Sequence, residues 1–174
     1  MNERKITLPD DLAAVAELEA GERVHLGGEI YTLRDAGHKR LVESIKRGKP
    51  DFDVRGKAIY YCGPTPPENG EIIGSCGPTT SARMDDYAPA LYDEGLKITI
   101  GKGNRGAAVQ SAIVRNRAVY LIAVGGAAAL YKSCVISNEP VLYEDLGCEA
   151  LHRLRVRDMP LMVAIDSRGN NILK

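Results

Sequence analysis

Strand-like and helix-like segments alternate through most of this chain, and this alternation limits its possible folds more than any other feature. Residues 97–100 and 118–123 have the apolar, β-branched character of short strands. Helical segments are expected at residues 107–114 and from residue 127 onward. Strands that alternate with helices are typical of an α/β domain with a substantially parallel sheet. We therefore predict an α/β fold.

The remaining segments fit the same class. A strand over residues 24–32 should bend at Gly27 and Gly28, and an amphipathic helix capped by Asp35 should end before Gly48. The other expected elements are strands at 5–8, 57–61, 71–75, 135–136, 141–143 and 161–165, helices at 12–18, capped by Asp10 or Asp11, and at 81–91, and turns at 66–70 and 166–170.

Composition limits the size of the domain and the kinds of partner. The 174 residues suffice for one compact domain over residues 1–174, with no linker or low-complexity tract. Formal net charge is zero and basic residues are scattered, so a nucleic-acid partner is not expected. The first 26 residues lack the apolar core of a signal peptide, and no later apolar run is long enough to span a bilayer. These features predict a cytoplasmic protein with no membrane partner.

The cysteines do not form a recognisable metal motif. Cys62, Cys76, Cys134 and Cys148 form no Cys-x-x-Cys pair, and too few further ligands are clustered near them for a structural zinc. In a reducing compartment most of them should be small buried apolar residues rather than disulfide partners. We expect this chain to bind no metal by itself.

The tetrapeptide Cys-Gly-Pro-Thr occurs twice, at residues 62–65 and 76–79, with different residues after each copy. The first copy runs into a turn-forming stretch, which indicates a strand end. The second runs into the predicted helix at residue 81, so Thr79, Thr80 or Ser81 could cap that helix. Free backbone N–H groups and the helix dipole would then favour an anion at this point.

Basic residues lie beside this copy and at two similar junctions. Arg83 falls in the first turn of the predicted helix, where it indicates either a bound carboxylate or phosphate, or a structural salt bridge. Arg34 ends one strand, and Lys102 lies between turn glycines after another, where a simple surface lysine is the alternative. Because α/β sheets place their sites at strand-to-helix junctions, Arg34, Thr79, Arg83 and Lys102 could together bind a small dianion.

Two other features point less clearly to function. Gly125 and Gly126 do not complete a dinucleotide-binding motif, and close packing of a helix on the sheet explains them better. His38 lies one helical turn after Arg34 and could support the same edge. His25 and His152 are expected to be structural.

With these residues assembled, the chain resembles the β subunit, or C-terminal domain, of the iron–sulfur class I fumarate hydratase and tartrate dehydratase family. The resemblance covers nearly the whole chain, in order. The stretches that carry it are IYTLRDAGHKRL, GKAIYYCGPTP, IIGSCGPTTSARMD, ITIGKGNRG, YLIAVGGAAALYKS and YEDLGCEALHRLRVRDMPLMVAIDSRGN. The resemblance implies the family's swivelling β/β/α domain and a hydro-lyase activity that reversibly hydrates a trans-dicarboxylic alkene.

The resemblance also implies roles for individual residues. Thr79 matches the family's catalytic base, and Arg34, Arg83 and Lys102 match residues that bind substrate carboxylates. The family's four-iron four-sulfur cluster is held by the partner α subunit, so a hetero-oligomer is expected, or a homodimer when the chain is isolated. YYCGPTP and VGGAAAL favour fumarate over tartrate as the substrate.

The chemistry is consistent with this division between two subunits. Dehydrating malate needs a base, cations for an enediolate-like carboxylate, and a Lewis acid, and this chain offers the first two. Thr79 would need nearby positive charge, a helix dipole and exclusion of water to act as a base. The alternatives are a tartrate or other hydroxydicarboxylate dehydratase subunit, and a noncatalytic domain that binds a dicarboxylate or phosphate.

Overall fold

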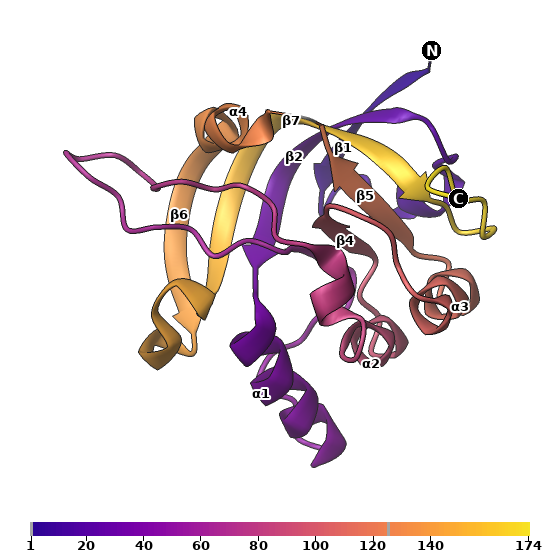
Figure 1. Ribbon diagram of the computed structural model, residues 1–174, viewed down its shortest axis with the longest axis horizontal. Coiled ribbons are helices and arrows are strands. Elements are labelled where there is room, and N and C mark those ends of the chain that lie inside the picture. Colours follow the sequence, from indigo (N-terminus) through magenta and orange to yellow (C-terminus); the bar gives the residue numbers. More distant parts are fainter. Residues whose placement is uncertain (1, 125) are drawn as a thin grey trace.

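Five strands close into a barrel in the computed structural model of the chain, which describes residues 2–124 and 126–174 (Figure 1). Parallel pairing runs from β2 through β3 and β4 to β5. β7 closes the ring because it pairs antiparallel with both β5 and β2. Met1 and Gly125 lie outside the described residues. The close packing predicted for Gly125 and Gly126 is wrong at Gly126, which is exposed and where an added Cβ would meet no atom within 4 Å.

Two further strands extend the sheet beyond the ring. β1 pairs parallel with the first half of β2, and β6 pairs antiparallel with the first half of β7. The strands are β1 (Glu3–Leu8), β2 (Arg23–Thr32), β3 (Ala58–Tyr60), β4 (Ile98–Gly101), β5 (Val119–Ala123), β6 (Val135–Leu142) and β7 (Leu151–Ile165).

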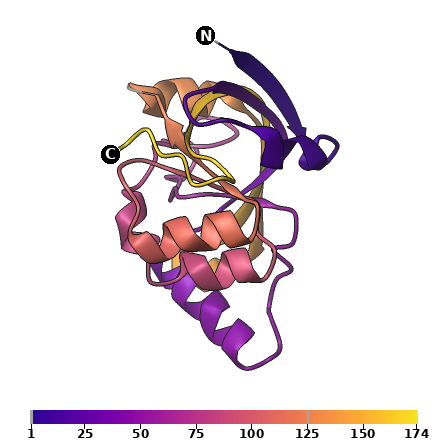
Figure 2. The same cartoon turned by 90° about the vertical axis from the view of Figure 1, so that its right-hand side faces the viewer.

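Three α-helices lie on one side of the barrel, with α2 and α3 next to each other, and α4 lies at the opposite end (Figures 1 and 2). The helices are α1 (Asp35–Lys46), α2 (Ala88–Asp93), α3 (Ala107–Arg115) and α4 (Ala127–Cys134), with 3-10 helices η1 (Leu12–Glu17), η2 (Ser81–Met84) and η3 (Glu144–Glu149). None of the helices in the described part of the chain has the length and apolar character needed to cross a membrane.

Alternating side chains divide the core into two layers. Ile98 and Ile100 on β4 belong to the cluster that fills the barrel, together with residues of β2 and β7. Tyr120 on β5 belongs to the second cluster, which lies between the barrel and helices α1 to α3. The period of two in a strand places neighbouring residues on opposite faces, so both faces of β4 and β5 are buried. The predicted α/β class is confirmed.

The sheet is less parallel than predicted, because β7 is a single strand of 15 residues that runs antiparallel to its neighbours. The sequence had indicated only short closing strands in this region. β7 stays continuous by bending near Asp158, whose φ of 48° lies in the left-handed region. The predicted bend in β2 is confirmed at Gly28, where φ is 86° and the pairing with β7 shifts register.

The predicted helix over residues 81–91 is wrong as a continuous element. The chain forms the four-residue η2 and then starts α2 at Ala88. Pro89 explains the break, because it has no N–H to donate to a preceding turn and is tolerated only in the first turn of a helix. Thr80 is the N-cap of η2, yet its side chain makes no capping hydrogen bond. The predicted helix-capping anion site therefore loses its structural basis.

Two other local predictions need correction. Residues 71–75 form no strand but part of a loop over residues 61–80 that extends beyond β6 (Figure 1). Prolines 66 and 67 remove backbone donors, and most of residues 66–72 are exposed. The segment predicted as a helix over residues 12–18 is the 3-10 helix η1. Asp11 precedes it, but its carboxylate accepts a hydrogen bond from Thr7 N–H instead of capping η1.

Candidate functional site

The predicted site residues follow three neighbouring strands. Arg34 comes after β2, Thr79 and Arg83 lie on the long connection after β3, and Lys102 follows β4. Since β2, β3 and β4 are parallel and adjacent, their carboxyl ends share one edge of the barrel. The structure thus brings the four residues to the same edge. The strand-to-helix argument holds for Arg34 and Lys102, but Thr79 and Arg83 reach the edge through the loop after β3, because residues 71–75 form no strand.

Backbone hydrogen bonds join the Thr79 segment to the Lys102 segment. The Thr79 N–H donates to the Tyr61 carbonyl at 2.6 Å, and the Ser81 N–H donates to the Lys102 carbonyl at 2.9 Å. Thr80 and Lys102 also form an isolated parallel bridge. Thr79 is half-buried and Lys102 is exposed. The hydroxyl-bearing segment and the lysine-bearing segment are therefore tied together through their backbones.

Asp35 links the two arginines. Its carboxylate accepts two hydrogen bonds from Arg83, at 3.1 Å from Nε and 3.0 Å from Nη2, and lies 3.7 Å from Nη2 of Arg34. Asp35 does not cap α1 as predicted, because Arg34 occupies the N-cap position and Asp35 is the first helical residue. Arg83 therefore forms a salt bridge, one of the two alternatives that the sequence indicated for it. Its side chain is 51% exposed and not buried.

The positions of Arg34 and His38 are coupled. The His38 Nδ1–H donates to the Arg34 carbonyl at 2.8 Å, and burial lowers the pKa of His38 to about 4, so the ring is neutral at pH 7. The Arg34 side chain lies over Gly63, where an added Cβ would come within 2.6 Å of Arg34 Cδ. Arg34 Nε is buried without a hydrogen-bond partner among the described residues. His38 thus supports the edge through the backbone.

The two Cys-Gly-Pro-Thr segments meet at their cysteines. The sulfur atoms of Cys62 and Cys76 are 3.4 Å apart and buried. The hydrogen bond to Cys76, together with burial, raises the pKa of Cys62. Cys134 is also buried, whereas Cys148 is exposed. Among the described residues, no group of three or more histidine, cysteine or acidic side chains could hold a metal ion.

Sequence reasoning missed an ion pair beneath this edge. Arg105, three residues after Lys102, is buried and donates from Nε to Asp85 at 2.7 Å. Asp85 directly follows η2. A signal was available, because Arg105 directly precedes the start of a helix, where a positive charge is unfavourable unless an anion lies nearby. The partnership with Asp85 required the fold.

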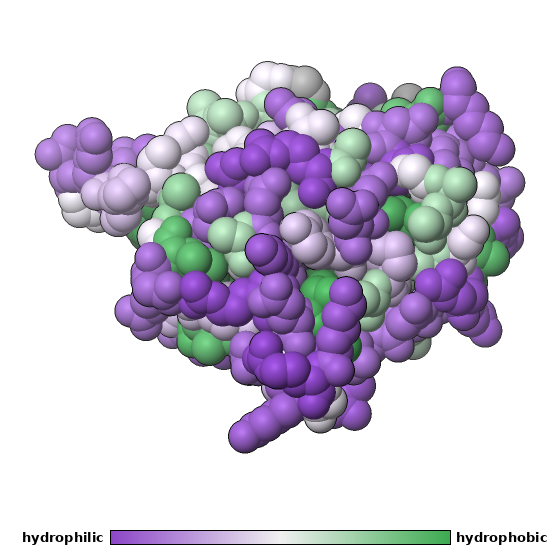
Figure 3. Space-filling view, turned by 60° about the horizontal axis from the view of Figure 1, so that its bottom comes forward, coloured by the Kyte–Doolittle hydropathy of each residue, from purple (hydrophilic) through white to green (hydrophobic). Residues whose placement is uncertain are grey.

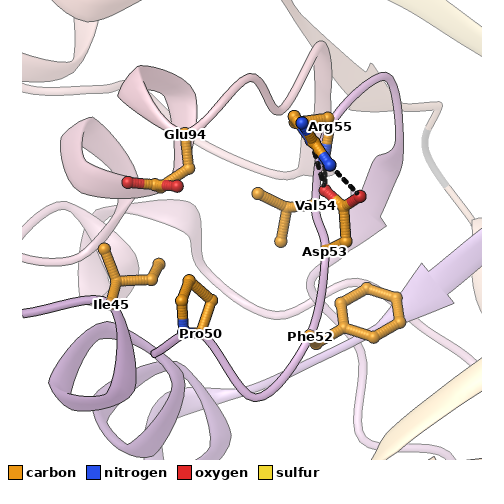
Figure 4. A pocket seen from close by; sticks show the side chains of 7 residues that line it. All are labelled: Ile45, Pro50, Phe52, Asp53, Val54, Arg55 and Glu94. Atoms are coloured by element: carbon orange, nitrogen blue, oxygen red, sulfur yellow. Dashed lines mark hydrogen bonds and ion pairs between the residues drawn. The ribbon is translucent and has the colours of Figure 1, made fainter. Parts of the chain in front are cut away.

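The edge differs from the hollow drawn in Figure 4, which has a volume of about 300 Å³. That hollow contains none of the four predicted site residues. Its lining residues are Ile45, Pro50, Phe52, Asp53, Val54, Arg55 and Glu94. The molecular face that includes α1 is mostly hydrophilic, with hydrophobic residues in small separate areas (Figure 3).

The arrangement at the edge suits a small dianion. Three cationic side chains and one carboxylate leave an excess of positive charge, and the Thr79 hydroxyl lies on the same segment as Arg83. No residue in the described part of the chain hydrogen-bonds to that hydroxyl. Arginine can hold a carboxylate through two parallel hydrogen bonds, which the pairing of Arg83 with Asp35 already demonstrates.

Comparison with known proteins gives this arrangement a context. The chain is 35% identical over 167 residues to the aerobic class I fumarate hydratase of Escherichia coli strain K12, covering 94% of this chain and 30% of that protein. It is 38% identical to a putative class I fumarate hydratase of Geobacillus stearothermophilus, covering 97% and 34%. The chain therefore spans about a third of the length of these relatives.

A shorter relative matches over most of its own length. The L(+)-tartrate dehydratase subunit beta of Escherichia coli strain K12 is 35% identical over 173 residues, covering 97% of this chain and 85% of that subunit. The family model described as Fumarase C-terminus matches residues 1–174. The chain belongs to the Fumarase C-terminus family.

Proposed function

We propose that this chain is the β subunit of a hydro-lyase that reversibly hydrates fumarate to malate. The observation that carries the proposal is the meeting of Arg34, Arg83, Lys102 and the Thr79 segment at the carboxyl edge of three parallel strands. The match to a separate β subunit over 85% of its length supports a subunit role.

In this proposal the cations bind the two carboxylates of the substrate. Arg83 and Arg34 already face one carboxylate, that of Asp35, so their guanidinium groups are oriented toward an anion on this edge. Lys102, directly after β4, adds a third positive charge. Positive charge fixed in place stabilises the enediolate-like carboxylate that forms when a proton leaves the adjacent carbon.

Thr79 serves as the base in this proposal. Its hydroxyl has no hydrogen-bond partner among the residues that the structure describes, and its backbone is held by the bond to Tyr61. Threonine is a weak base at its free pKa and needs positive charge and a dry site. Because η2 has only four residues, its dipole contributes little, and activation rests on Arg83 and Lys102.

The edge is open in this chain, so a partner must complete it. Arg83 is 51% exposed and Lys102 is exposed, whereas proton abstraction by threonine requires exclusion of water. The cysteines do not fit an iron–sulfur cluster, since no group of three or more histidine, cysteine or acidic side chains in the described part of the chain could hold a metal ion. We propose that the family's four-iron four-sulfur cluster is held by a partner α subunit, in a cytoplasmic hetero-oligomer.

The substrate has one specific alternative. The identities to the E. coli fumarate hydratase and to the tartrate dehydratase subunit are both 35%, so the comparison favours neither substrate. We favour fumarate on the stretches YYCGPTP and VGGAAAL. Tartrate dehydration is the second candidate, and the match to the tartrate dehydratase subunit over 85% of its length supports it.

Reconstitution tests the proposed function. The chain is combined anaerobically with a family α subunit carrying its cluster, and turnover of malate and of tartrate is measured. The chain alone should be inactive, and the complex should use malate far better than tartrate. Preference for tartrate would select the second candidate, and turnover by the iron-free chain alone would refute the two-subunit site.

A further inference from the structure

Arg105 is the most completely buried charged side chain near the proposed site, with its side chain 0% exposed. All three guanidinium nitrogens donate hydrogen bonds: Nε to Asp85 at 2.7 Å, Nη1 to the Thr99 hydroxyl at 3.1 Å and Nη2 to the Tyr61 hydroxyl at 3.0 Å. Its carbon Cζ lies 5.1 Å from the ring centre of Tyr61 and 4.9 Å from that of Tyr120. The guanidinium is therefore fixed from every side.

These contacts join the two segments that carry Thr79 and Lys102. Asp85, at the end of η2, accepts one bond from Arg105 and another from the Gly106 N–H at 2.7 Å. Tyr120 lies across the same junction, with its hydroxyl 2.8 Å from the Ser81 hydroxyl and 2.7 Å from the Gly103 carbonyl. Residues 103–106 are thus attached to η2 and Asp85 on the C-terminal side of Lys102.

The close approach of these segments depends on Gly101. A Cβ at this position would collide with the Ser81 hydroxyl and lie within 2.9 Å of the Tyr61 ring. The side chain of Ser81 can therefore lie directly against β4, which places η2 beside the strand that ends at Lys102. The ion pair between Arg105 and Asp85 holds the same two segments together at the other end of residues 102–106.

Energetics favour a role beyond stability. Moving a guanidinium and a carboxylate out of water costs several kcal/mol, and apolar residues of similar volume often stabilise a core equally well. An apolar side chain could not satisfy Asp85, Thr99 and Tyr61 together. What the ion pair provides is a fixed geometry between β4, β5, the segment directly after β3 and the end of η2. The side chains at that junction are those of the proposed site.

We propose that Arg105 is a positioning residue, which with Asp85 holds the Lys102 segment against the Thr79–Arg83 segment in the geometry that the reaction requires. The proposal rests on the proposed function for its catalytic consequence. Arg105 itself does not reach the surface and so does not bind substrate. Lysine cannot replace it, because a single ammonium cannot span acceptors on three elements.

The test compares Arg105→Lys, Asp85→Asn, their double variant and a control, Arg115→Lys. Arg115 also forms a two-bonded pair with aspartate, Asp93, but is 49% exposed at the far end of α3. In the reconstituted complex, each of the first two variants should lower kcat/KM for malate about 10- to 100-fold, since small misplacements of catalytic groups cost this much. Arg115→Lys should leave it unchanged.

Two measurements separate positioning from loss of folding. Rates are taken well below the unfolding midpoint of each variant, and hydrogen exchange of the Ser81 amide is followed in the chain alone. Ser81 donates to the Lys102 carbonyl, so its protection should fall in Arg105→Lys while amides of β7 stay protected. The double variant should lose less than the product of the single losses, because both changes break one ion pair.

The outcomes are distinct. Unchanged kcat/KM in both single variants, or losses that track only the unfolded fraction with normal Ser81 protection, would overturn the proposal. If the wild-type complex turned over no dicarboxylate, the proposed function would fail. Selective loss of Ser81 protection in Arg105→Lys would then still support the positioning of the two segments, and unchanged protection would overturn it.

Discussion

The first Cys-Gly-Pro-Thr segment, residues 62–65, and the second, residues 76–79, have the same sequence and opposite surroundings. In the first, the Thr65 hydroxyl accepts a hydrogen bond from the Ser75 N–H at 2.7 Å, and its backbone bonds to Ser75 and Gly74. In the second, no described residue bonds to the Thr79 hydroxyl. One threonine closes a loop, and the other is free to act on a ligand.

The glycines of the two segments differ in the same way. The missing side chain of Gly63 makes room for Arg34, whereas that of Gly77 faces Ala128, where an added Cβ would lie 3.2 Å from the Ala128 Cβ. The first segment therefore contributes to the candidate site only because Gly63, which has no side chain, leaves space for Arg34. Identical residues acquire different roles because the elements that follow them differ.

The threonines give the largest expected difference. Thr79→Val should lower kcat of the reconstituted complex about 10²- to 10⁴-fold, the usual cost of removing a general base. Thr65→Val should cost about 1 kcal/mol of unfolding free energy through the lost bond to Ser75, with little change in kcat. Steady-state rates and thermal unfolding of both variants measure this contrast.

Both substitutions keep the β-branched shape, so packing losses should be similar in the two variants. Thr65→Ser, which retains the hydroxyl, is the matched control for the loop and should behave like wild type. Equal losses of kcat in Thr65→Val and Thr79→Val, with both proteins folded, would remove Thr79 from the role of base.

Substitution of the two glycines should give a smaller difference, in KM for malate. Gly63→Ala should displace Arg34, because the new Cβ would meet Arg34 Cδ at 2.6 Å and the Cys148 carbonyl at 3.1 Å. A lost charge-assisted hydrogen bond is worth about 1.5–3 kcal/mol, so KM for malate should rise about 10- to 100-fold. Gly77→Ala should change KM for malate by less than about 2-fold, which corresponds to about 0.5 kcal/mol. A KM that responds equally to both would show that Arg34 does not bind substrate.

The smallest expected effect concerns the cysteines of the two segments, because Cys62 and Cys76 contact each other. Cys62→Ala and Cys76→Ala should each lower the free energy of unfolding by about 1 kcal/mol. The double variant should depart from additivity by about 0.5 kcal/mol or more, because the two sulfur atoms touch. Denaturant unfolding measures this, with Cys62→Ala combined with Cys134→Ala as an additive control. Additivity in the Cys62 and Cys76 pair would contradict the packing of the two segments.

Local patterns were sufficient for much of the fold. Apolar spacing with Gly48 located α1, and β-branched runs located β4 and β5, because these signals depend on residues close in the chain. Local rules failed where distant partners decided the structure. β7 stays one strand because it pairs with β2, β5 and β6. The break between η2 and α2 is different, because its cause, Pro89, is a local signal that the predicted helix over residues 81–91 did not take into account.

The same distinction applies to the candidate site. The sequence by itself determined that Arg34 and Lys102 follow strands, and the parallel order of those strands then required both residues to share an edge. Thr79 and Arg83 reach the same edge through contacts of the long loop after β3, which only the tertiary structure decided. Only the tertiary structure decided that Asp35 joins two arginines rather than capping a helix, and that Arg105 is buried against Asp85. Sequence patterns report neighbours along the chain, whereas ion pairs are chosen by distances in space between residues that may be 48 positions apart, as Asp35 and Arg83 are.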